Sequence, residues 1–166
     1  FQDLSYHFYL PTKRFGDFSL FSFGGLSKQF YDVVKDSTKW KSEGDKYGDQ
    51  FISNTGLWGA THQVHTGRNQ LLKTALAYSV MNSSYNRDYV QENYSMLNVY
   101  DQKSVTKKLT FSSVLNQRFN SRLMLRSGVI ASHIQFDFAE QIREKKSDPL
   151  KELVNVSAST QTIQLF

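Results

Sequence analysis

The sequence contains no cysteine, so it can hold neither a disulfide bond nor a thiolate metal ligand. This absence is compatible with an oxidising compartment such as the periplasm. No run of about 18 apolar residues occurs, which excludes a transmembrane helix. P-loop, dinucleotide and G-x-S-x-G motifs are also missing, and no nucleophile is placed beside a base. We therefore expect no enzymatic activity and no cofactor.

Hydrophobic residues are scarce as well, at 39% of the chain, which is low for a protein with a large core of its own. Aromatic residues nevertheless reach 14%, with 13 Phe and 9 Tyr. This mixture is typical of strands whose one face meets lipid and whose other face meets water. The net charge is +5, but the basic residues are scattered along the chain, so no nucleic-acid partner is predicted.

Alternation with period two dominates the chain and predicts long antiparallel strands. Three hairpins are expected, over residues 4–30, 50–84 and 105–138, with tight turns at 13–16, 67–70 and 119–120. A last strand is expected over 153–166. Polar, aperiodic stretches predict long loops at residues 32–49, 85–104 and 139–151.

Centring each turn on its two middle residues gives the expected strand register. In the first hairpin, Tyr6 would face Phe23 and Phe8 would face Phe21, with four rings on one side. The second register pairs Leu57 with Val80 and Gly59 with Tyr78, an aromatic ring covering a strand glycine. The third pairs Leu109 with Ile130 and Phe111 with Gly128. The residues expected to face lipid are Leu57, Leu76, Val80, Leu109, Phe111, Ile130 and Ile134. The more polar face is expected to carry Trp58, Ala60, His62, Lys73 and Ala77.

Short turns that alternate with long loops are typical of outer-membrane barrels, whose periplasmic turns are short and extracellular loops long. Each predicted strand also supplies the roughly 9–11 tilted residues that a span requires. We therefore predict an all-β fold, a segment of an up-and-down antiparallel transmembrane β-barrel with about seven long strands. Residues 1–166 would form part of a single barrel domain. The first residues resemble neither a signal peptide nor an initiator start, and the last lie within a predicted strand, so we expect a longer parent protein.

Three stretches carry a resemblance to a known family: LPTKRFGDFSLFSFGG (residues 10–25), GLWGATHQVHTGRNQLLKTALAYS (residues 56–79) and FNSRLMLRSGVIASHIQFDF (residues 119–138). They resemble the barrel of a TonB-dependent outer-membrane receptor of Gram-negative bacteria. The resemblance covers essentially the whole chain. It implies a barrel of about 22 strands closed by an N-terminal plug domain, and energised uptake of a scarce ligand such as a siderophore, oligosaccharide or peptide.

The implied partners are the outer-membrane bilayer, the remainder of the barrel, the plug, the TonB system and an accessory or lid lipoprotein. The sequence carries no plug and no TonB-binding segment of its own. Other interpretations stay open: an outer-membrane barrel with a structural, adhesive or secretion-linked role, a soluble secreted β-sandwich that binds a ligand, or an outer-membrane enzyme.

Few residues suggest a chemical site. His62 and His65 form H-x-x-H, but positions i and i+3 of a strand point to opposite faces, so joint metal ligation is not expected; His7 and His133 lack carboxylate partners at metal spacing. Acidic loop residues could bind calcium, or simply be solvated: Glu43, Asp45, Asp49, Asp88 and Glu92. Basic residues near the turns could contact lipid phosphates or the plug, or be ordinary interfacial charges: Arg68, Lys73, Arg118 and Arg122. Loop aromatics could hold a sugar or siderophore, or pack within the loops: Trp40, Tyr47, Tyr85, Tyr89 and Tyr94.

Overall fold

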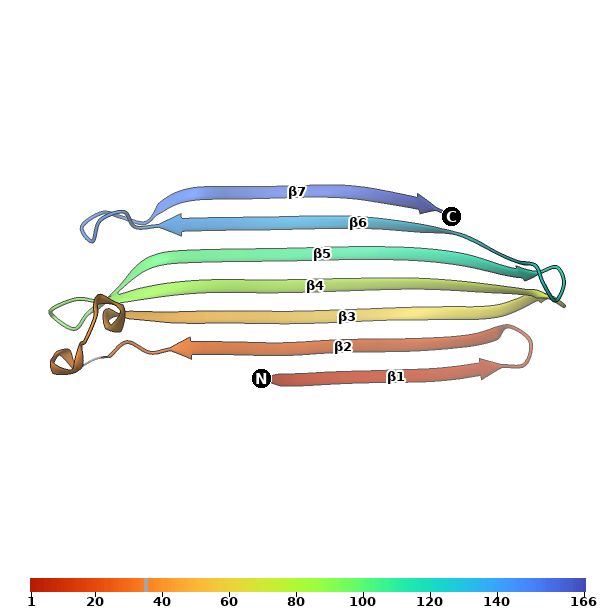
Figure 1. The fold of residues 1–166 in the computed structure, drawn as a ribbon, viewed down its shortest axis with the longest axis horizontal. Coiled ribbons are helices and arrows are strands. Elements are labelled where there is room, and N and C mark those ends of the chain that lie inside the picture. Colours follow the sequence, from red (N-terminus) through yellow and green to blue (C-terminus); the bar gives the residue numbers. More distant parts are fainter. Residues whose placement is uncertain (35) are drawn as a thin grey trace.

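The computed structural model describes residues 1–34 and 36–166 as one antiparallel sheet with the strand order β1-β2-β3-β4-β5-β6-β7 (Figure 1). The strands are β1 (Gln2–Thr12), β2 (Gly16–Tyr31), β3 (Tyr47–Gly67), β4 (Gln70–Val90), β5 (Met96–Arg118), β6 (Met124–Ile142) and β7 (Lys151–Leu165). The predicted all-β, up-and-down organisation with seven long strands is confirmed. The sheet is not closed, because β1 and β7 each pair with one neighbour only.

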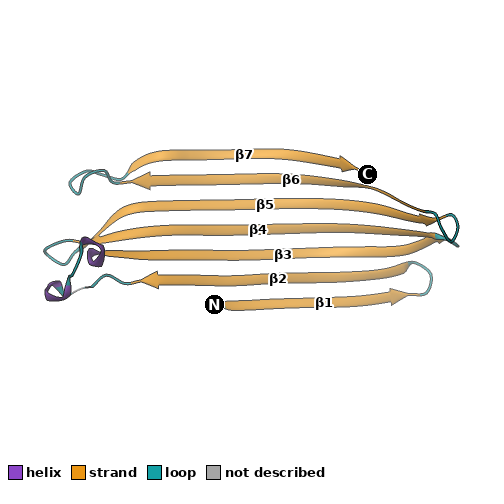
Figure 2. Ribbon diagram, in the orientation of Figure 1, coloured by secondary structure: helices purple, strands orange, loops and turns teal. Residues whose placement is uncertain are grey.

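All three tight turns lie at one end of the sheet, the turn end, and the other connections lie at the loop end (Figure 2). The turns comprise residues 13–15, 68–69 and 119–123. At the loop end, residues 32–46 connect β2 to β3 and contain two short 3-10 helices, η1 (Ser37–Lys39) and η2 (Glu43–Lys46). The other two loop-end connections are only residues 91–95 and 143–150. The long loops predicted at 85–104 and 139–151 are therefore wrong, because their polar residues continue the strand pairing.

The register differs from the predicted one by an odd number of residues in every hairpin, which moves each side chain to the opposite face relative to its partner strand. In the first hairpin Thr12 pairs with Gly16 across a three-residue turn, so Tyr6 lies opposite Ser22 instead of Phe23. Four rings do not share one side there. In the third hairpin Arg118 pairs with Met124 across a five-residue turn, and Leu109 therefore lies opposite His133.

The second hairpin shows a different cause of the same error. Its turn is the predicted one, since Gly67 pairs with Gln70, but the next pair is His65 with Leu71. Thr66 is thus an extra residue in β3, a β-bulge, which changes the register of the rest of the hairpin. Leu57 consequently pairs with Ser79 instead of Val80.

The first turn depends on a backbone conformation that favours glycine. Gly16 has φ 83°, in the left-handed region where a Cβ atom is costly. The Thr12 hydroxyl closes the same turn: its oxygen accepts a hydrogen bond from the Phe15 amide at 3.0 Å and donates one to the Gly16 carbonyl at 2.6 Å.

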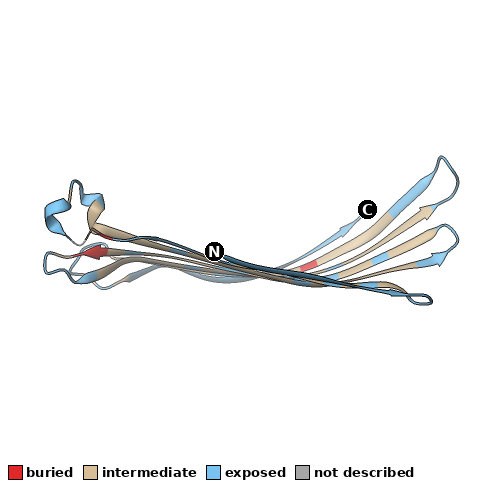
Figure 3. Cartoon of the chain, turned by 90° about the horizontal axis from the view of Figure 1, so that it is seen from below, coloured by how far each residue is buried: buried red, intermediate tan, exposed pale blue. Residues whose placement is uncertain are grey.

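The sheet is a single twisted layer with almost no core, as the edge-on view in Figure 3 shows. Among the described residues only three hydrophobic side chains are buried, Val33, Tyr89 and Val90, all near the loop end. The accessible surface is 11954 Å² for 19.2 kDa, whereas a compact monomer of that mass exposes about 8,400 Å². A large apolar area therefore lacks cover. Within the described part of the chain, no helix is long and apolar enough to cross a membrane.

Candidate membrane-facing surface and loop-end cluster

One face of the sheet, here the Leu76 face, carries an uninterrupted apolar row perpendicular to the strands. The register places one apolar residue of each strand in this row: Phe8, Leu20, Ala60, Leu76, Phe111, Ala131 and Ile163. The five large members are 41% to 73% exposed. Exposed apolar side chains aligned across seven strands form a contiguous surface, which normally marks contact with a partner or a membrane.

The opposite face, the Ala77 face, has small and polar residues at the same level, apart from Phe21. The equivalent row is His7, Phe21, Gly59, Ala77, Thr110, Ser132 and Thr162. Hydroxyl groups pair across strands on this face: the Ser19 and Thr61 hydroxyls are 2.5 Å apart, and those of Thr110 and Ser132 are 3.2 Å apart. Such pairs stabilise neighbouring strands. The two faces of the sheet therefore have different chemical character around this level.

The predicted lipid-facing residues divide between the two faces. Leu76, Val80, Leu109 and Phe111 share the Leu76 face, but Leu57, Ile130 and Ile134 lie on the Ala77 face. Ile130 and Ile134 adjoin a further apolar patch of β6 on that face, where the rings of Phe136 and Phe138 stack at 6.1 Å. The single predicted lipid face across these hairpins is thus wrong in part, because the odd register errors exchange the faces of one strand relative to the next.

The residues predicted for the polar face divide in the same way. Trp58, Ala60 and His62 lie on the Leu76 face, whereas Lys73 and Ala77 lie opposite. Gly59 is covered by an aromatic ring, as predicted, but the ring is that of Phe21 instead of Tyr78, and a Cβ atom at Gly59 would overlap it.

Aromatic residues border the apolar row on its loop-end side. Tyr6, Trp58 and Tyr78 belong to the next row of the Leu76 face, two residues along each strand. The rings of Trp58 and Tyr78 stack with centroids 6.3 Å apart. Tyr and Trp rings with one apolar and one polar edge are enriched where a barrel surface leaves the hydrocarbon. We call these three residues the aromatic belt.

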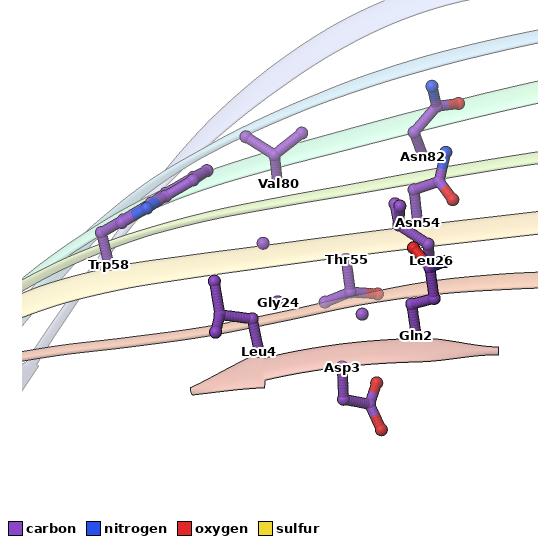
Figure 4. Close-up of a pocket in the computed structure, with 12 residues that line it drawn as sticks. Gln2, Asp3, Leu4, Gly24, Leu26, Asn54, Thr55, Trp58, Val80 and Asn82 are labelled. Atoms are coloured by element: carbon purple, nitrogen blue, oxygen red, sulfur yellow. The ribbon is translucent and has the colours of Figure 1, made fainter. Parts of the chain in front are cut away.

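A hollow of about 460 Å³ interrupts the Leu76 face next to the belt (Figure 4). Gly24 and Gly56 are directly paired and form its floor. The side chains of Leu4, Trp58 and Val80 stand around them, as Figure 4 shows. The absence of two side chains on adjacent strands therefore creates a mostly apolar depression that an acyl chain or an apolar side chain of a partner could fill.

The loop end of the Ala77 face carries an ionic and aromatic cluster, the loop-end cluster. Arg87 binds Asp49 with Nε to Oδ1 at 2.7 Å and a second guanidinium nitrogen to Oδ2 at 3.3 Å. The Tyr85 hydroxyl donates to the same Asp49 carboxylate at 2.7 Å. The Arg87 guanidinium also lies 5.7 and 5.8 Å from the ring centroids of Tyr47 and Tyr85. The guanidinium holds the pKa of Asp49 below its ordinary value.

The neighbouring strands extend this cluster. Tyr100 packs its ring 5.6 Å from that of Tyr85 and donates its hydroxyl to Glu140 at 2.6 Å. This hydrogen bond to a carboxylate raises the pKa of Tyr100 to about 12. Lys146, from the β6–β7 connection, lies 3.8 Å from the ring centroid of Tyr89. The rings of this cluster, with Arg87 and Lys146, line a hollow of about 540 Å³.

Of the predicted loop aromatics, Tyr47, Tyr85 and Tyr89 meet in the loop-end cluster. Trp40 does not, because its indole N–H donates to the Val34 carbonyl within the β2–β3 connection. Tyr94 occupies the β4–β5 connection, with its hydroxyl 3.1 Å from that of Ser37. The sequence does not point to the four further members Arg87, Tyr100, Glu140 and Lys146, because its polar composition predicts loops over those stretches. Alternation in Tyr85-x-Arg87-x-Tyr89 was the signal that could have found Arg87.

The predicted acidic residues have separate partners. Glu43 pairs with Lys46, Asp49 with Arg87, and Asp88 accepts a hydrogen bond from Asn98. Asp45 accepts from the amides of Lys41 and Ser42, and Glu92 lies in the β4–β5 connection. No group of three metal-binding side chains occurs among the described residues.

The two histidines of H-x-x-H point to opposite faces, as predicted. His62 stacks on Phe18 at 4.4 Å on the Leu76 face, with Nε2 2.7 Å from the Phe15 carbonyl oxygen. His65 pairs with Leu71, which in turn pairs with Asn116 on the Ala77 face.

No protein-family profile matches this chain, and no curated protein matches it at a significant level.

Proposed function

We propose that this chain is a segment of an outer-membrane β-barrel whose Leu76 face meets hydrocarbon and whose Ala77 face meets the barrel interior. The apolar row across all seven strands is the observation that carries the proposal. A row of this kind needs an apolar neighbour, and the fold supplies none from the described residues. Hydrocarbon is the neighbour that suits strands this long, since β3, β4 and β5 have 21, 21 and 23 residues and a span takes about 9–11.

The unpaired edges of β1 and β7 support the same proposal. Lipid offers no hydrogen bonds, so a spanning sheet has to pair every strand and close on itself. Seven strands would thus be completed by further strands of a longer protein. The apolar patch at Phe136 and Phe138 on the Ala77 face would then contact material inside the barrel, such as a plug domain.

A receptor of the TonB-dependent kind is the barrel that we propose. The resemblance of residues 10–25, 56–79 and 119–138 supports this choice. The loop-end cluster supports it too, because aromatic rings, a guanidinium and carboxylates around a hollow suit a polar ligand that arrives from outside the cell. Uptake would require a plug and the TonB system, and an accessory lipoprotein could cover the mouth.

Spin labels on adjacent residues test the membrane assignment. Because this chain has no cysteine, Leu76→Cys and Ala77→Cys each give it one labelling site. In the full-length protein folded into phosphatidylcholine vesicles, we expect the label at residue 76 to collide with oxygen, which concentrates in lipid. The label at residue 77 should be much less accessible to oxygen. Equal oxygen accessibility at both sites, or preference for a water-soluble nickel reagent at residue 76, would reject the proposal.

A soluble secreted β-sandwich is the second candidate, because a second sheet could also cover the Leu76 face. In that case the protein would stay monomeric in water without detergent, and the label at residue 76 would be shielded from both oxygen and nickel. An outer-membrane barrel of another kind would also give high oxygen accessibility at residue 76. It would differ from the proposed receptor in having no plug domain in the full-length protein.

A further inference from the structure

The net positive charge of the chain is concentrated at the turn end. Residues 11–18, 65–72 and 116–126 contain six basic residues and one acidic residue, so they carry a formal charge of +5, which equals the charge of the whole chain. The basic residues, here the turn-end basic cluster, are Lys13, Arg14, Arg68, Arg118, Arg122 and Arg126. The rest of the chain has 14 basic and 14 acidic residues. The basic residues are spread along the sequence, but the excess of basic over acidic residues is confined to these three ranges.

These charges also lack carboxylate partners. All five ion pairs among the described residues lie at the loop end or in the loop-side part of β5, and none involves the turn-end basic cluster. Every member of the cluster is exposed. The three turns lie at the same end of the sheet (Figure 1), so their guanidinium and ammonium groups give that end a positive field that a partner can neutralise.

Exposed apolar side chains occupy the same turns. Phe15 is 67% exposed, and Phe119 and Leu123 are 51% and 56% exposed. Basic residues beside exposed aromatic and aliphatic residues are typical of segments that rest in a membrane interface, where the apolar groups enter the acyl region and the cations meet phosphates. An acidic protein surface would neutralise the charge but would leave these three side chains without an apolar partner.

The position along the strands agrees with a lipid headgroup layer. From the aromatic belt to the turn tips the chain runs eight residues in β1 (Tyr6 to Arg14) and ten in the second hairpin (Trp58 to Arg68). Eight to ten extended residues cover roughly 26–34 Å, or about 20–26 Å along the membrane normal at a strand tilt of about 40°. The apolar band of outer-membrane barrels is about 25 Å tall. The belt and the turn tips therefore match its two borders.

We infer that Arg14, Arg68 and Arg122 of the turn-end basic cluster bind the headgroups of anionic phospholipids in the leaflet next to the tight turns. Arg118 and Arg126 lie on the Ala77 face, toward the barrel interior, and take no part in this binding. This inference rests on the proposed function, since it requires the Leu76 face to lie in a bilayer. Each of these three arginines comes from a different turn, and no other side chain of the described residues forms an ion pair with them.

Electron paramagnetic resonance with spin-labelled lipids tests the inference. The full-length protein is reconstituted in phosphatidylcholine vesicles with a trace of spin-labelled phosphatidylglycerol or phosphatidylcholine, and the fraction of motionally restricted lipid gives the relative association. We expect phosphatidylglycerol to associate at least about threefold more strongly than phosphatidylcholine. One basic residue near an anionic membrane surface strengthens binding by at most about fivefold. The preference should disappear in Arg14→Gln/Arg68→Gln/Arg122→Gln and in 1 M salt, where the screening length is about 3 Å.

The matched control removes three charges from the loop end with Lys39→Gln/Lys41→Gln/Lys145→Gln, and it should keep the preference. Equal association of both lipids with the unaltered protein would overturn the inference and leave an acidic protein surface as the occupant. Loss of the preference in the control as well would also overturn it, since net charge alone would then be responsible. Absence of any restricted lipid would instead reject the proposed function. If the triple variant does not fold, the salt dependence of the unaltered protein decides the question.

Discussion

At the scale of single residues, adjacent positions on one strand have opposite surroundings. Leu76 is half exposed within the apolar row, while Ala77 lies opposite Gly59 and Thr110 on the polar side. Neighbouring side chains of a strand always point to opposite faces, so two substitutions one residue apart probe two different environments without any change in backbone structure.

Arginine substitutions make this contrast measurable. An arginine on the lipid face costs about 2–4 kcal/mol at mid-bilayer and less near an interface. Because Tyr78 of the aromatic belt is only two residues away, we expect Leu76→Arg to cost about 2 kcal/mol and Ala77→Arg to cost much less. Urea unfolding of the full-length protein in vesicles measures both values. A larger loss from Ala77→Arg would mean that the two faces are assigned the wrong way round.

The hydrogen bond from Tyr100 to Glu140 has a predictable dependence on pH. The pKa of Tyr100 is raised to about 12 from the ordinary value of 10.0, so this bond stabilises the fold fully below pH 10 and the contribution is lost as the pH rises toward 12. Glu140→Ala removes the acceptor, and the pKa of Tyr100 should fall toward 10. Tyrosinate absorbance, as a difference from Tyr100→Phe, measures it. Glu144→Ala is the control, since Glu144 binds Lys151 instead, and an unchanged titration after Glu140→Ala would refute the assignment.

At the scale of elements, the sequence predicted the hairpins but not their registers. Alternation of side chains locates a strand, and a turn motif locates its end, but the face that each residue occupies depends on the number of residues in the turn. Arg14 and Phe15 do lie in the first turn, with Lys13 as a third member that the pattern did not distinguish. The bulge at Thr66 follows from no composition rule. Polar strand ends such as Tyr85–Val90 are predicted as loops because exposed strands and loops have similar compositions.

Deletion of Thr66 tests the origin of the second register. Because Thr66 is the extra residue between His65 and Gly67, its removal should leave every other β3–β4 pair in place, and we expect a folded protein with nearly unchanged stability. Ala60 lies in the middle of the same strand. Its deletion should move all side chains on one side of the deletion to the opposite face of the sheet, and we expect it to destabilise the protein strongly. Cross-linking of paired cysteines at residues 57 and 79 reports the register. Loss of that cross-link on deletion of Thr66 would show that the bulge does not set the register.

At the scale of the whole molecule, the sheet has two open edges and an uncovered apolar face. Exposed edges promote pairing with other strands, and the surface area exceeds that of a compact monomer by about 3,500 Å². The alternation in the sequence predicts that the sheet has two different faces. It does not predict the apolar row, because the row exists only when the seven strands are aligned in the observed register. The loop-end cluster likewise unites residues of β3, β4, β5 and β6 that no local pattern connects.

Hydrogen exchange can test whether further strands complete the sheet. In the isolated chain in detergent, amides on the free edges of β1 and β7 should exchange quickly, whereas those of β4, which is paired on both sides, should be protected. In the full-length protein in vesicles, we expect the amides of β1 and β7 to reach protection similar to those of β4. Fast exchange at both edges in the full-length protein would show that no closed barrel forms around this segment.

The length of the central strands has a consequence for how the protein meets its surroundings. From the aromatic belt to the loop end, β3 and β4 continue for 11 and 12 residues, from Trp58 to Tyr47 and from Tyr78 to Val90. At about 3.3 Å per residue and a tilt of about 40° they would rise roughly 30 Å above the bilayer. In the proposed barrel, the wall above the bilayer would therefore consist mainly of hydrogen-bonded polar strands, and the loop-end connections would form only its rim.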